Sequence, residues 1–188
     1  DKDGFYDETF FFYKPIPCDN ISATVTLKKF RGKPQKPISQ IFPVVRTNTY
    51  QNRFGIISDI DDTILQSDVT NPMRLFYNTV FESPERRKPT TGTLEFYTML
   101  HNGFGKENNP FFYISNSPWT LYRRLKTFID TQKFPLGPIL LRDLSIQELR
   151  QSMHKKTTIT RILSDFPNLS FILIGDSGEK DLLIYQVC

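Results

Sequence analysis

The sequence predicts an α/β fold, a three-layer Rossmann-like arrangement in which helices cover both faces of a parallel sheet. Four short apolar runs, at residues 55–57, 111–114, 138–141 and 171–174, are bounded by polar, Gly or Pro residues. Helical patterns separate these runs. Continuous apolar strands that alternate with helices are typical of parallel sheets buried on both faces.

A short β-rich segment is expected over residues 1–48, ahead of the α/β domain over residues 49–188. Apolar and polar residues alternate from Ile21 to Leu27, which indicates a half-buried antiparallel strand. The aromatic run 10–13 predicts another strand. Residues 31–40 contain two prolines and two lysines and predict a loop or linker.

Two longer helices have clear sequence signals. Ser117 as N-cap and Pro118 at the first helical position predict the start of one helix. Its apolar stripe consists of Leu121, Leu125, Phe128 and Ile129. The stripe of the second helix consists of Ile159, Ile162, Leu163 and Phe166, and Pro167 ends it.

Three weaker helical patterns occupy residues 72–81, residues 93–101 and the chain from Asp181 onward. The last of these is interrupted after about two turns, so we expect the α/β domain to be truncated at its C-terminus. The chain begins with Asp rather than Met, so a natural N-terminal segment is expected to be missing as well.

Composition bounds the location and the partners. No apolar run approaches the ~18 residues of a membrane-spanning helix, and the two cysteines lie near opposite ends without metal-ligand spacing. These features indicate a reducing compartment. We therefore expect a cytoplasmic protein, either free or attached peripherally to membranes. The net charge of +4 fits an anionic substrate or membrane surface; no nucleic-acid partner is expected.

The first apolar run ends in two carboxylates, Asp59 and Asp61, separated by one residue. Carboxylates at the end of a buried strand are costly unless they are paired with a cation, and Mg²⁺ takes such oxygens together with substrate phosphate. An Asp-rich turn that caps a helix explains the same residues. A calcium loop fits less well, because Ile64 and Thr70 occupy positions that require Gly and Glu.

The second run ends in Ser115 and Asn116, just before the predicted helix start. A hydroxyl and an amide beside the free N–H groups of a helix N-terminus form a natural phosphate-binding site. Simple helix capping is the alternative. Lys155 or Lys156 lies near the start of the helix that follows, where a cation favours an anionic partner; a solvated lysine is the alternative.

The last run ends in Gly175 and Asp176, and Asp181 offers a further carboxylate. The tetrapeptide Gly-Asp-Ser-Gly also surrounds the nucleophile of chymotrypsin-like proteases. We reject that interpretation, because Glu179 replaces the next glycine and the surrounding pattern is α/β. Three strand ends therefore carry reactive side chains, at the edge of the sheet where α/β proteins bind ligands.

Together these segments resemble the four motifs of the haloacid dehalogenase superfamily, in their required order. The stretch 59–63 matches the DxDxT signature, and Ser115 matches the strand-end Ser/Thr. Lys155 matches the motif lysine, with Lys156 as the alternative, and Asp176 with Asp181 matches the closing acidic motif. Over residues 40–185, the chain also resembles the catalytic domain of the actin-patch-protein type of phosphatidate phosphatase. Matching stretches there are 57–64, 112–119, 134–138, 154–155, 165–168 and 171–179.

The resemblance implies Mg²⁺-dependent hydrolysis of phosphatidate to diacylglycerol through an aspartyl-phosphate. It implies Asp59 as nucleophile and Asp61 as general acid and base. The implied metal ligands are Asp59, Asp61, Asp176 and Asp181. The implied substrate-binding residues are Thr63, Ser115, Asn116 and Lys155. Two alternatives stay open, a phosphatase of soluble phosphate monoesters or phosphoproteins and a catalytically silent module that binds membranes or proteins.

Overall fold

The computed structural model describes residues 20–25, 38–43, 54–60, 92–105, 108–142 and 151–175. The chain divides into two compact units, Asp1–Arg46 and Thr47–Cys188. Each unit is described by itself below.

The first unit contains a pair of antiparallel strands. Strand β1 (Asn20–Val25) pairs with β2 (Ile38–Pro43), from Asn20 opposite Pro43 to Val25 opposite Ile38. The antiparallel strand expected from the alternating pattern is therefore confirmed over residues 21–25. The expected loop over 31–40 was wrong for residues 38–40, because β1 requires a partner for its backbone hydrogen bonds. Residues 10–13 and 31–37 lie outside the described residues.

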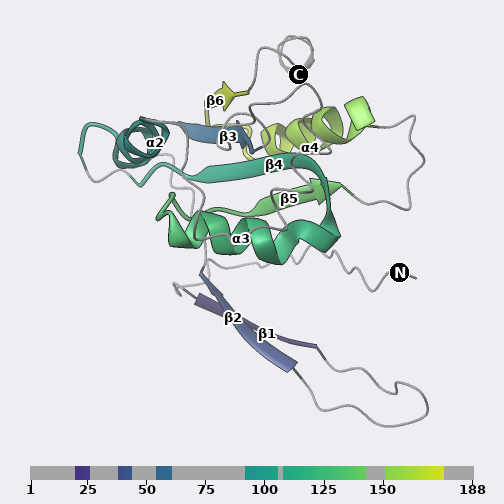
Figure 1. The fold of residues 1–188 in the computed structure, drawn as a ribbon. Helices are drawn as coiled ribbons and strands as arrows, with labels where there is room; N and C mark the ends of the chain where they lie inside the picture. Colours follow the sequence, from purple (N-terminus) through teal and green to yellow (C-terminus); the bar gives the residue numbers. More distant parts are fainter. Residues whose placement is uncertain are drawn as a thin grey trace, which may run out of the picture. The chain divides into compact units, whose positions relative to one another are not determined.

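The second unit is built on a parallel sheet. Its strands are β3 (Gly55–Asp59), β4 (Phe111–Pro118), β5 (Ile139–Arg142) and β6 (Phe171–Ile174), in the order β5-β4-β3-β6. Each neighbouring pair is parallel, as Figure 1 shows. The four apolar runs thus form the four strands, and the predicted α/β Rossmann-like fold is confirmed.

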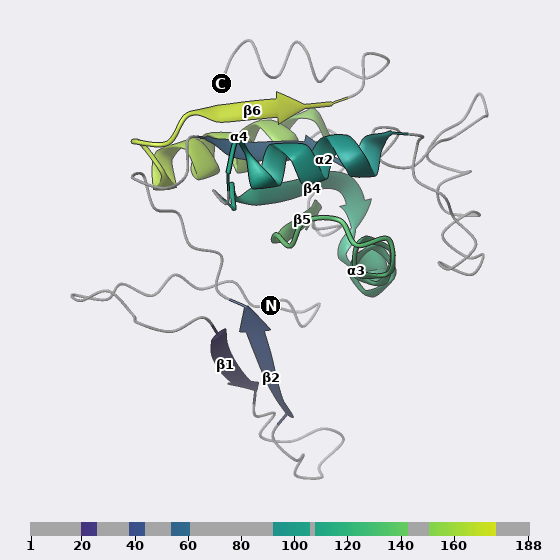
Figure 2. The ribbon, with the colours of Figure 1, turned by 90° about the vertical axis from the view of Figure 1, so that its left-hand side faces the viewer.

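Helices cover both faces of this sheet. They are α2 (Thr93–Asn102), α3 (Tyr122–Thr131), preceded by the 3₁₀ turn η2 (Trp119–Leu121), and α4 (Gln151–Asp165). Figures 1 and 2 show α2 and α4 on opposite faces. Side chains of α2 and α3 share one buried cluster with Ile56 and Ile60, whereas those of α4 share another with Ile57 and Ile114. The sheet therefore separates two cores, as a three-layer fold requires.

The start of α3 differs from the sequence prediction. Ser117 is not an N-cap and Pro118 is not the first helical residue, because β4 continues through Pro118, whose backbone is extended (φ −72°, ψ 156°). The 3₁₀ turn follows, and α3 begins at Tyr122. Pairing of Pro118 with Arg142 of β5 holds the end of β4 in the strand. The predicted apolar stripe is nevertheless buried.

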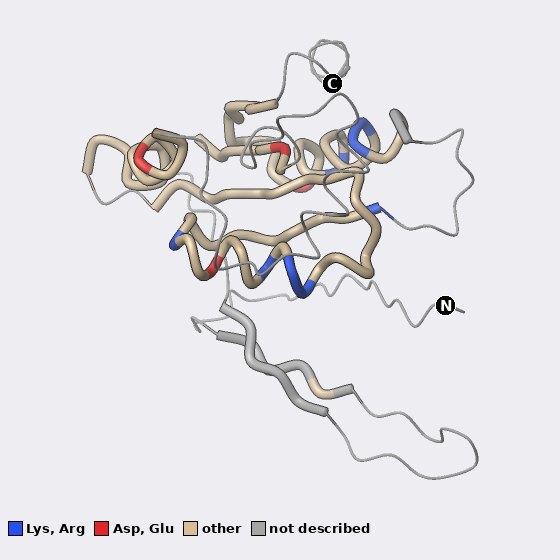
Figure 3. The backbone as a smooth tube through the Cα atoms, in the orientation of Figure 1, with Lys and Arg blue, Asp and Glu red and all other residues tan. Residues whose placement is uncertain are grey.

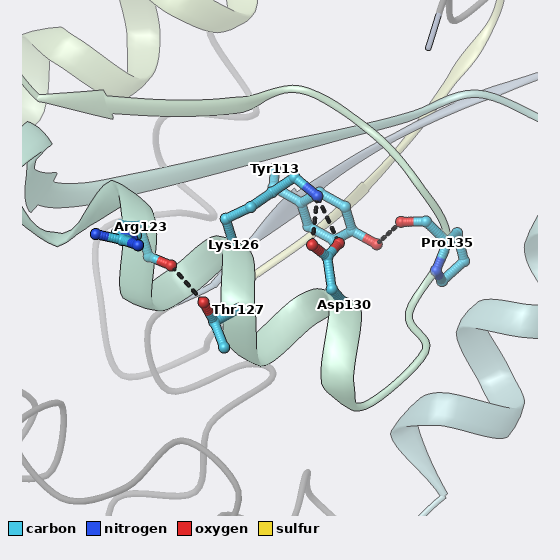
Figure 4. Close-up of polar contacts among 6 residues, drawn as sticks. All are labelled: Tyr113, Arg123, Lys126, Thr127, Asp130 and Pro135. Atoms are coloured by element: carbon cyan, nitrogen blue, oxygen red, sulfur yellow. Dashed lines mark hydrogen bonds and ion pairs between the residues drawn. The ribbon is translucent and has the colours of Figure 1, made fainter. Parts of the chain in front are cut away.

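Polar contacts fix α3 and the loop that leads into β5 (Figure 4). Tyr113 of β4 donates a 2.8 Å hydrogen bond to the carbonyl oxygen of Pro135. On the exposed face of α3, Lys126 pairs with Asp130 one turn later. Such exposed pairs contribute little to stability, so the buried bond of Tyr113 matters more for the position of β5.

The helix expected at 93–101 is confirmed by α2, and the stripe that ends at Pro167 is confirmed by α4. The helical patterns at 72–81 and from Asp181 onward lie outside the described residues. Within the part of the chain that the structure describes, no helix has the length and apolar character to cross a membrane.

Candidate active site

The strands of the parallel sheet carry only two charged residues, Asp59 and Arg142. Each is the last residue of its strand, β3 and β5 respectively. In Figure 3 most of the charge of the described residues lies on the helices instead. Both strand-end charges thus lie at the carboxyl edge of the sheet, where ligands bind in this fold class.

Asp59 forms a buried ion pair with Lys155 of α4. The Lys155 Nζ atom lies 2.9 Å from the Asp59 Oδ1 atom, and the side chains are 2% and 1% exposed. Helix α4 connects β5 to the parallel strand β6, so its first turns lie at the carboxyl edge of the sheet. Lys156, the alternative motif lysine, is exposed. The geometry therefore places Lys155 at the strand-end carboxylate.

A second contact supports Asp59 from the opposite face of the sheet. The Ser58 Oγ atom donates a 2.8 Å hydrogen bond to the backbone oxygen of Asp59 and lies 2.6 Å from the Tyr97 hydroxyl of α2. The pKa of Tyr97 is raised to about 12, mainly by burial and also by the nearby Asp59 charge, against the lowering effect of the hydrogen bond with Ser58. Tyr97 therefore stays protonated and keeps its hydroxyl hydrogen near neutral pH.

The end of β4 lies directly beside Asp59. Asp59 is opposite Ile114 in the β3–β4 register, and the Ile60 N–H donates to the Ile114 oxygen at 3.1 Å. The next residue, Ser115, is buried, and its Oγ atom accepts a 2.9 Å hydrogen bond from the Ser117 N–H. Ser115 thus directly follows the residue of β4 that lies opposite Asp59.

A β-bulge interrupts the pairing of β4 with β5. Ser115 is opposite Leu141 and Pro118 is opposite Arg142, so Asn116 and Ser117 have no counterpart on β5. Bulges redirect side chains and occur often beside active sites. The Asn116 Oδ1 atom is buried and has no hydrogen-bond partner among the described residues.

His154 precedes Lys155 on α4 and is only partly exposed. Burial lowers the pKa of His154, and the nearby charges of Arg142 and Lys155 lower it further. Hydrogen bonding to the backbone of Leu140 and Ser115 opposes this shift. The imidazole is therefore neutral over a wider pH range than a solvated histidine.

Four residues assigned to the site from the sequence, Asp61, Thr63, Asp176 and Asp181, lie outside the described residues. Their roles stay predictions. The register of the sheet can be followed as far as Ile174 of β6, which is opposite Ser58 of β3. The described part of the chain ends there at Gly175, the residue before Asp176.

The fit of a divalent metal can be tested on Asp59 alone. Its carboxylate is a buried hard-oxygen donor at the strand end, which suits Mg²⁺. Lys155 balances its charge, so a cation at this position would share the carboxylate with the ammonium group. Among the described residues, no group of three or more His, Cys, Asp or Glu is placed to hold a metal, and the other predicted ligands lie outside them.

Sequence reasoning missed Ser58, Tyr97 and Arg142. Ser58 and Tyr97 are 39 residues apart, and nothing in the local pattern indicates which tyrosine faces β3. Arg142 did carry a signal, because it is a charged residue at the end of an apolar run, the same feature that identified Asp59.

Comparisons with known proteins identify relatives of this chain. The family described as the catalytic domain of the phosphatidate phosphatase APP1 matches residues 54–188. The phosphatidate phosphatase APP1 of Saccharomyces cerevisiae is 39% identical over 154 residues, which is 79% of this chain and 25% of that protein. An uncharacterised protein of Schizosaccharomyces pombe is 29% identical over 140 residues, or 72% of this chain and 22% of that protein. The chain thus spans about a quarter of the length of these relatives.

Proposed function

The chain belongs to the family of the phosphatidate phosphatase APP1 catalytic domain, and from this premise we propose that it hydrolyses phosphate monoesters through an aspartyl-phosphate on Asp59. The observation that carries the proposal is the buried Asp59–Lys155 pair at the carboxyl edge of the sheet. Burial of a carboxylate costs free energy because the charge loses its hydration. A protein that keeps a carboxylate in such a position often uses it in catalysis, and nucleophilic attack is one such use.

The reaction proceeds in two displacements. An Asp59 oxygen attacks phosphorus, and the bond from phosphorus to the ester oxygen breaks as the alcohol leaves. Water then attacks phosphorus, which releases inorganic phosphate and restores the Asp59 carboxylate. Asp61 protonates the leaving oxygen in the first step and takes a proton from water in the second.

The groups around Asp59 bind and orient the phosphoryl group. Lys155 directs its ammonium group at the carboxylate and neutralises charge on the phosphoryl oxygens. Ser115 accepts a bond from the Ser117 N–H, and its hydroxyl hydrogen can be donated to a phosphoryl oxygen. Asn116 and Thr63 are the other two proposed substrate-binding residues. Fixed donors that face the developing charge are usually the largest source of rate acceleration in such a site.

Mg²⁺ is the proposed cofactor, with Asp59, the backbone carbonyl of Asp61, Asp176 and Asp181 as the residues that would hold it. When bound, the metal neutralises charge on the phosphate and reduces its repulsion from the nucleophile. The buried carboxylate of Asp59 supports this assignment.

Phosphatidate is the proposed substrate and diacylglycerol the product. The support is the Saccharomyces cerevisiae relative, which is a phosphatidate phosphatase, and the match to its catalytic-domain family. Because phosphatidate resides in membranes, we propose that the protein acts at a membrane surface, on its cytoplasmic side.

The test is an assay of phosphate release from phosphatidate in detergent micelles and from soluble monoesters, with and without Mg²⁺. We expect Mg²⁺-dependent hydrolysis with a preference for phosphatidate. Asp59→Asn should abolish it, whereas Asp130→Asn, on the exposed face of α3, should not. Hydrolysis of soluble esters alone would reassign the substrate. Full activity of Asp59→Asn would exclude the covalent mechanism, and no hydrolysis at all by the wild type would favour a silent binding module.

A further inference from the structure

Arg142 is a strand-end charge to which the proposed mechanism gives no role. It ends β5, and side chains alternate between the two faces of a strand. Leu140, two residues earlier, packs into the core beneath α4, so Arg142 faces the same side of the sheet as α4. Its Nε atom is buried and has no hydrogen-bond partner among the described residues.

The same alternation places Asp59 on this face. Ile57, two residues before Asp59, packs into the core beneath α4, and Lys155 reaches Asp59 from that helix. Arg142 and Asp59 therefore end two strands on one face of one sheet edge, with only β4 between them. Two strand spacings amount to about 10 Å, a gap that a long arginine side chain and a phosphate group can bridge together.

Two further buried polar atoms lie in this region without a hydrogen-bond partner in the described part of the chain. They are Asn116 Oδ1, at the bulge of β4, and His154 Nε2, on α4. Arg142 is near enough to His154 for its charge to be felt there. An unsatisfied buried polar atom costs about 1–3 kcal/mol, so a group of them at one edge calls for an explanation such as a bound ligand.

The charges at this edge indicate which ligand fits. Lys155 already faces the Asp59 carboxylate, so its charge is balanced before a substrate arrives. Arg142 has no carboxylate partner among the described residues. A guanidinium group donates several hydrogen bonds in a planar fork that matches phosphate oxygens.

We propose that Arg142 is a further substrate-binding residue, whose guanidinium group holds oxygens of the substrate's phosphate group from the end of β5, across β4 from Asp59 on the same face of the sheet edge. Asn116 and His154 flank this contact. The proposal rests on the proposed phosphatase function and adds a second cation to the phosphate site. Its effect is on substrate binding more than on the chemical steps, because Arg142 contacts neither the nucleophile nor the leaving oxygen.

The test is a calorimetric titration of the 188-residue chain with inorganic phosphate, in the presence and absence of Mg²⁺. The variants are Arg142→Gln, Arg142→Lys and the matched control Arg161→Gln. Arg161 is an arginine on α4 whose side chain is 57% exposed and lies 3.8 Å from Asp165. Thermal unfolding of each variant accompanies the titrations.

We expect Arg142→Gln to weaken phosphate binding about tenfold or more, equivalent to about 1.4 kcal/mol, while Arg161→Gln binds as the wild type does. Arg142→Lys should lie between them, because lysine keeps the charge and loses the fork. In turnover assays Arg142→Gln should raise KM by a similar factor and lower kcat less.

Equal phosphate affinity in the wild type and Arg142→Gln would overturn the proposal, as would a wild type that binds no phosphate. Lower thermal stability with unchanged affinity would give Arg142 a structural role only. If Arg142→Gln does not fold, Arg142→Lys decides by the same affinity criterion. Because phosphate binding is measured without turnover, a wild type that binds phosphate through Arg142 but hydrolyses no ester would refute the proposed function and leave this contact standing.

Discussion

The Lys155 Nζ atom lies 2.9 Å from the Asp59 Oδ1 atom, and both side chains are almost completely shielded from water. Desolvation makes a buried ion pair a weak source of net stability, yet removal of one partner is strongly destabilising because the other charge stays buried and uncompensated. The two residues therefore depend on each other for the fold as well as for the proposed chemistry.

A double-mutant cycle with Asp59→Asn and Lys155→Met should reveal this dependence. Each single substitution should lower the free energy of unfolding by about 3–5 kcal/mol. The double variant should lose much less than the sum, because no uncompensated charge remains. Chemical denaturation of the four proteins gives the coupling energy directly.

The matched control is the Lys126–Asp130 pair, whose side chains are 41% and 45% exposed. The cycle with Lys126→Met and Asp130→Asn should give a coupling of no more than about 0.5 kcal/mol. Equal coupling in both cycles would mean that the Asp59–Lys155 pair is open to solvent.

Tyr97→Phe should lower kcat strongly and lower the free energy of unfolding only slightly. The substitution removes the hydroxyl that lies 2.6 Å from Ser58 Oγ and leaves Ser58 alone to hold the Asp59 backbone. The loss of one buried hydrogen bond costs about 1 kcal/mol, whereas a small displacement of a nucleophile can cost as much as about 100-fold in rate. Steady-state kinetics and denaturation measure the two effects.

Tyr113→Phe provides the comparison, because Tyr113 lies opposite Ser58 in the β3–β4 register, but its hydroxyl donates its buried 2.8 Å hydrogen bond to Pro135 instead of bonding Ser58. It should lose similar stability and keep its kcat. A kcat that falls equally in both variants would show that the Tyr97–Ser58 contact has no special role in positioning Asp59.

His154 should make the fold less stable as the pH falls. Burial lowers its pKa below the ordinary value of 6.5, so in this range the unfolded chain binds a proton more readily than the folded chain. Stability is thus fully present above pH 6.5 and declines below it, by as much as about 1.4 kcal/mol per pH unit. Denaturation of the wild type and His154→Gln from pH 8 to pH 5 isolates this contribution.

The difference in unfolding free energy between the two proteins should change steadily below pH 6.5, to the disadvantage of the wild type. A difference that is constant over the whole range would show that the imidazole titrates as a solvated group does.

The sequence predicts the sheet well, because strands buried on both faces require uninterrupted apolar runs. Residues 111–114 and 171–174 both lie in strands at the expected places. It fails at Ser117 and Pro118, where a local signal for a helix start is outweighed by the pairing of Pro118 with Arg142 of β5. That pairing joins residues about two dozen positions apart, so no local pattern reveals it.

The candidate site likewise contains some residues that the sequence identifies and others that it does not. Asp59, Ser115 and Lys155 can be identified from the sequence because each is a polar residue where an apolar pattern ends or a helix begins, and the structure brings them to one edge. The contact between Tyr97 and Ser58 cannot be identified from the sequence, because it depends on the way α2 packs against β3. Polar groups at strand ends carry a sequence signal, whereas the partners that orient them depend on tertiary packing.

Gly137→Ala should destabilise the second unit (Thr47–Cys188), whereas Gly105→Ala should not. A Cβ atom at Gly137 would lie 2.2 Å from the backbone oxygen of Phe111 and 2.8 Å from its carbonyl carbon, and backbone atoms cannot move aside as a flexible side chain can. Such overpacking typically costs about 1–3 kcal/mol. At Gly105 a Cβ atom would meet nothing within 4 Å, so alanine should leave stability unchanged or raise it by about 0.4–1 kcal/mol.

Denaturation of both variants compares their stabilities, and a phosphate titration compares their binding sites. Gly137 lies two residues before β5, so a shift of this segment away from β4 also moves the strand that ends in Arg142. Gly137→Ala should therefore weaken phosphate binding as well as stability, whereas the Tyr97–Ser58 contact on the other side of β4 should persist. If Gly137→Ala were as stable as Gly105→Ala, the segment before β5 would not lie against the first residue of β4, and the edge that carries Arg142 would be less firmly placed.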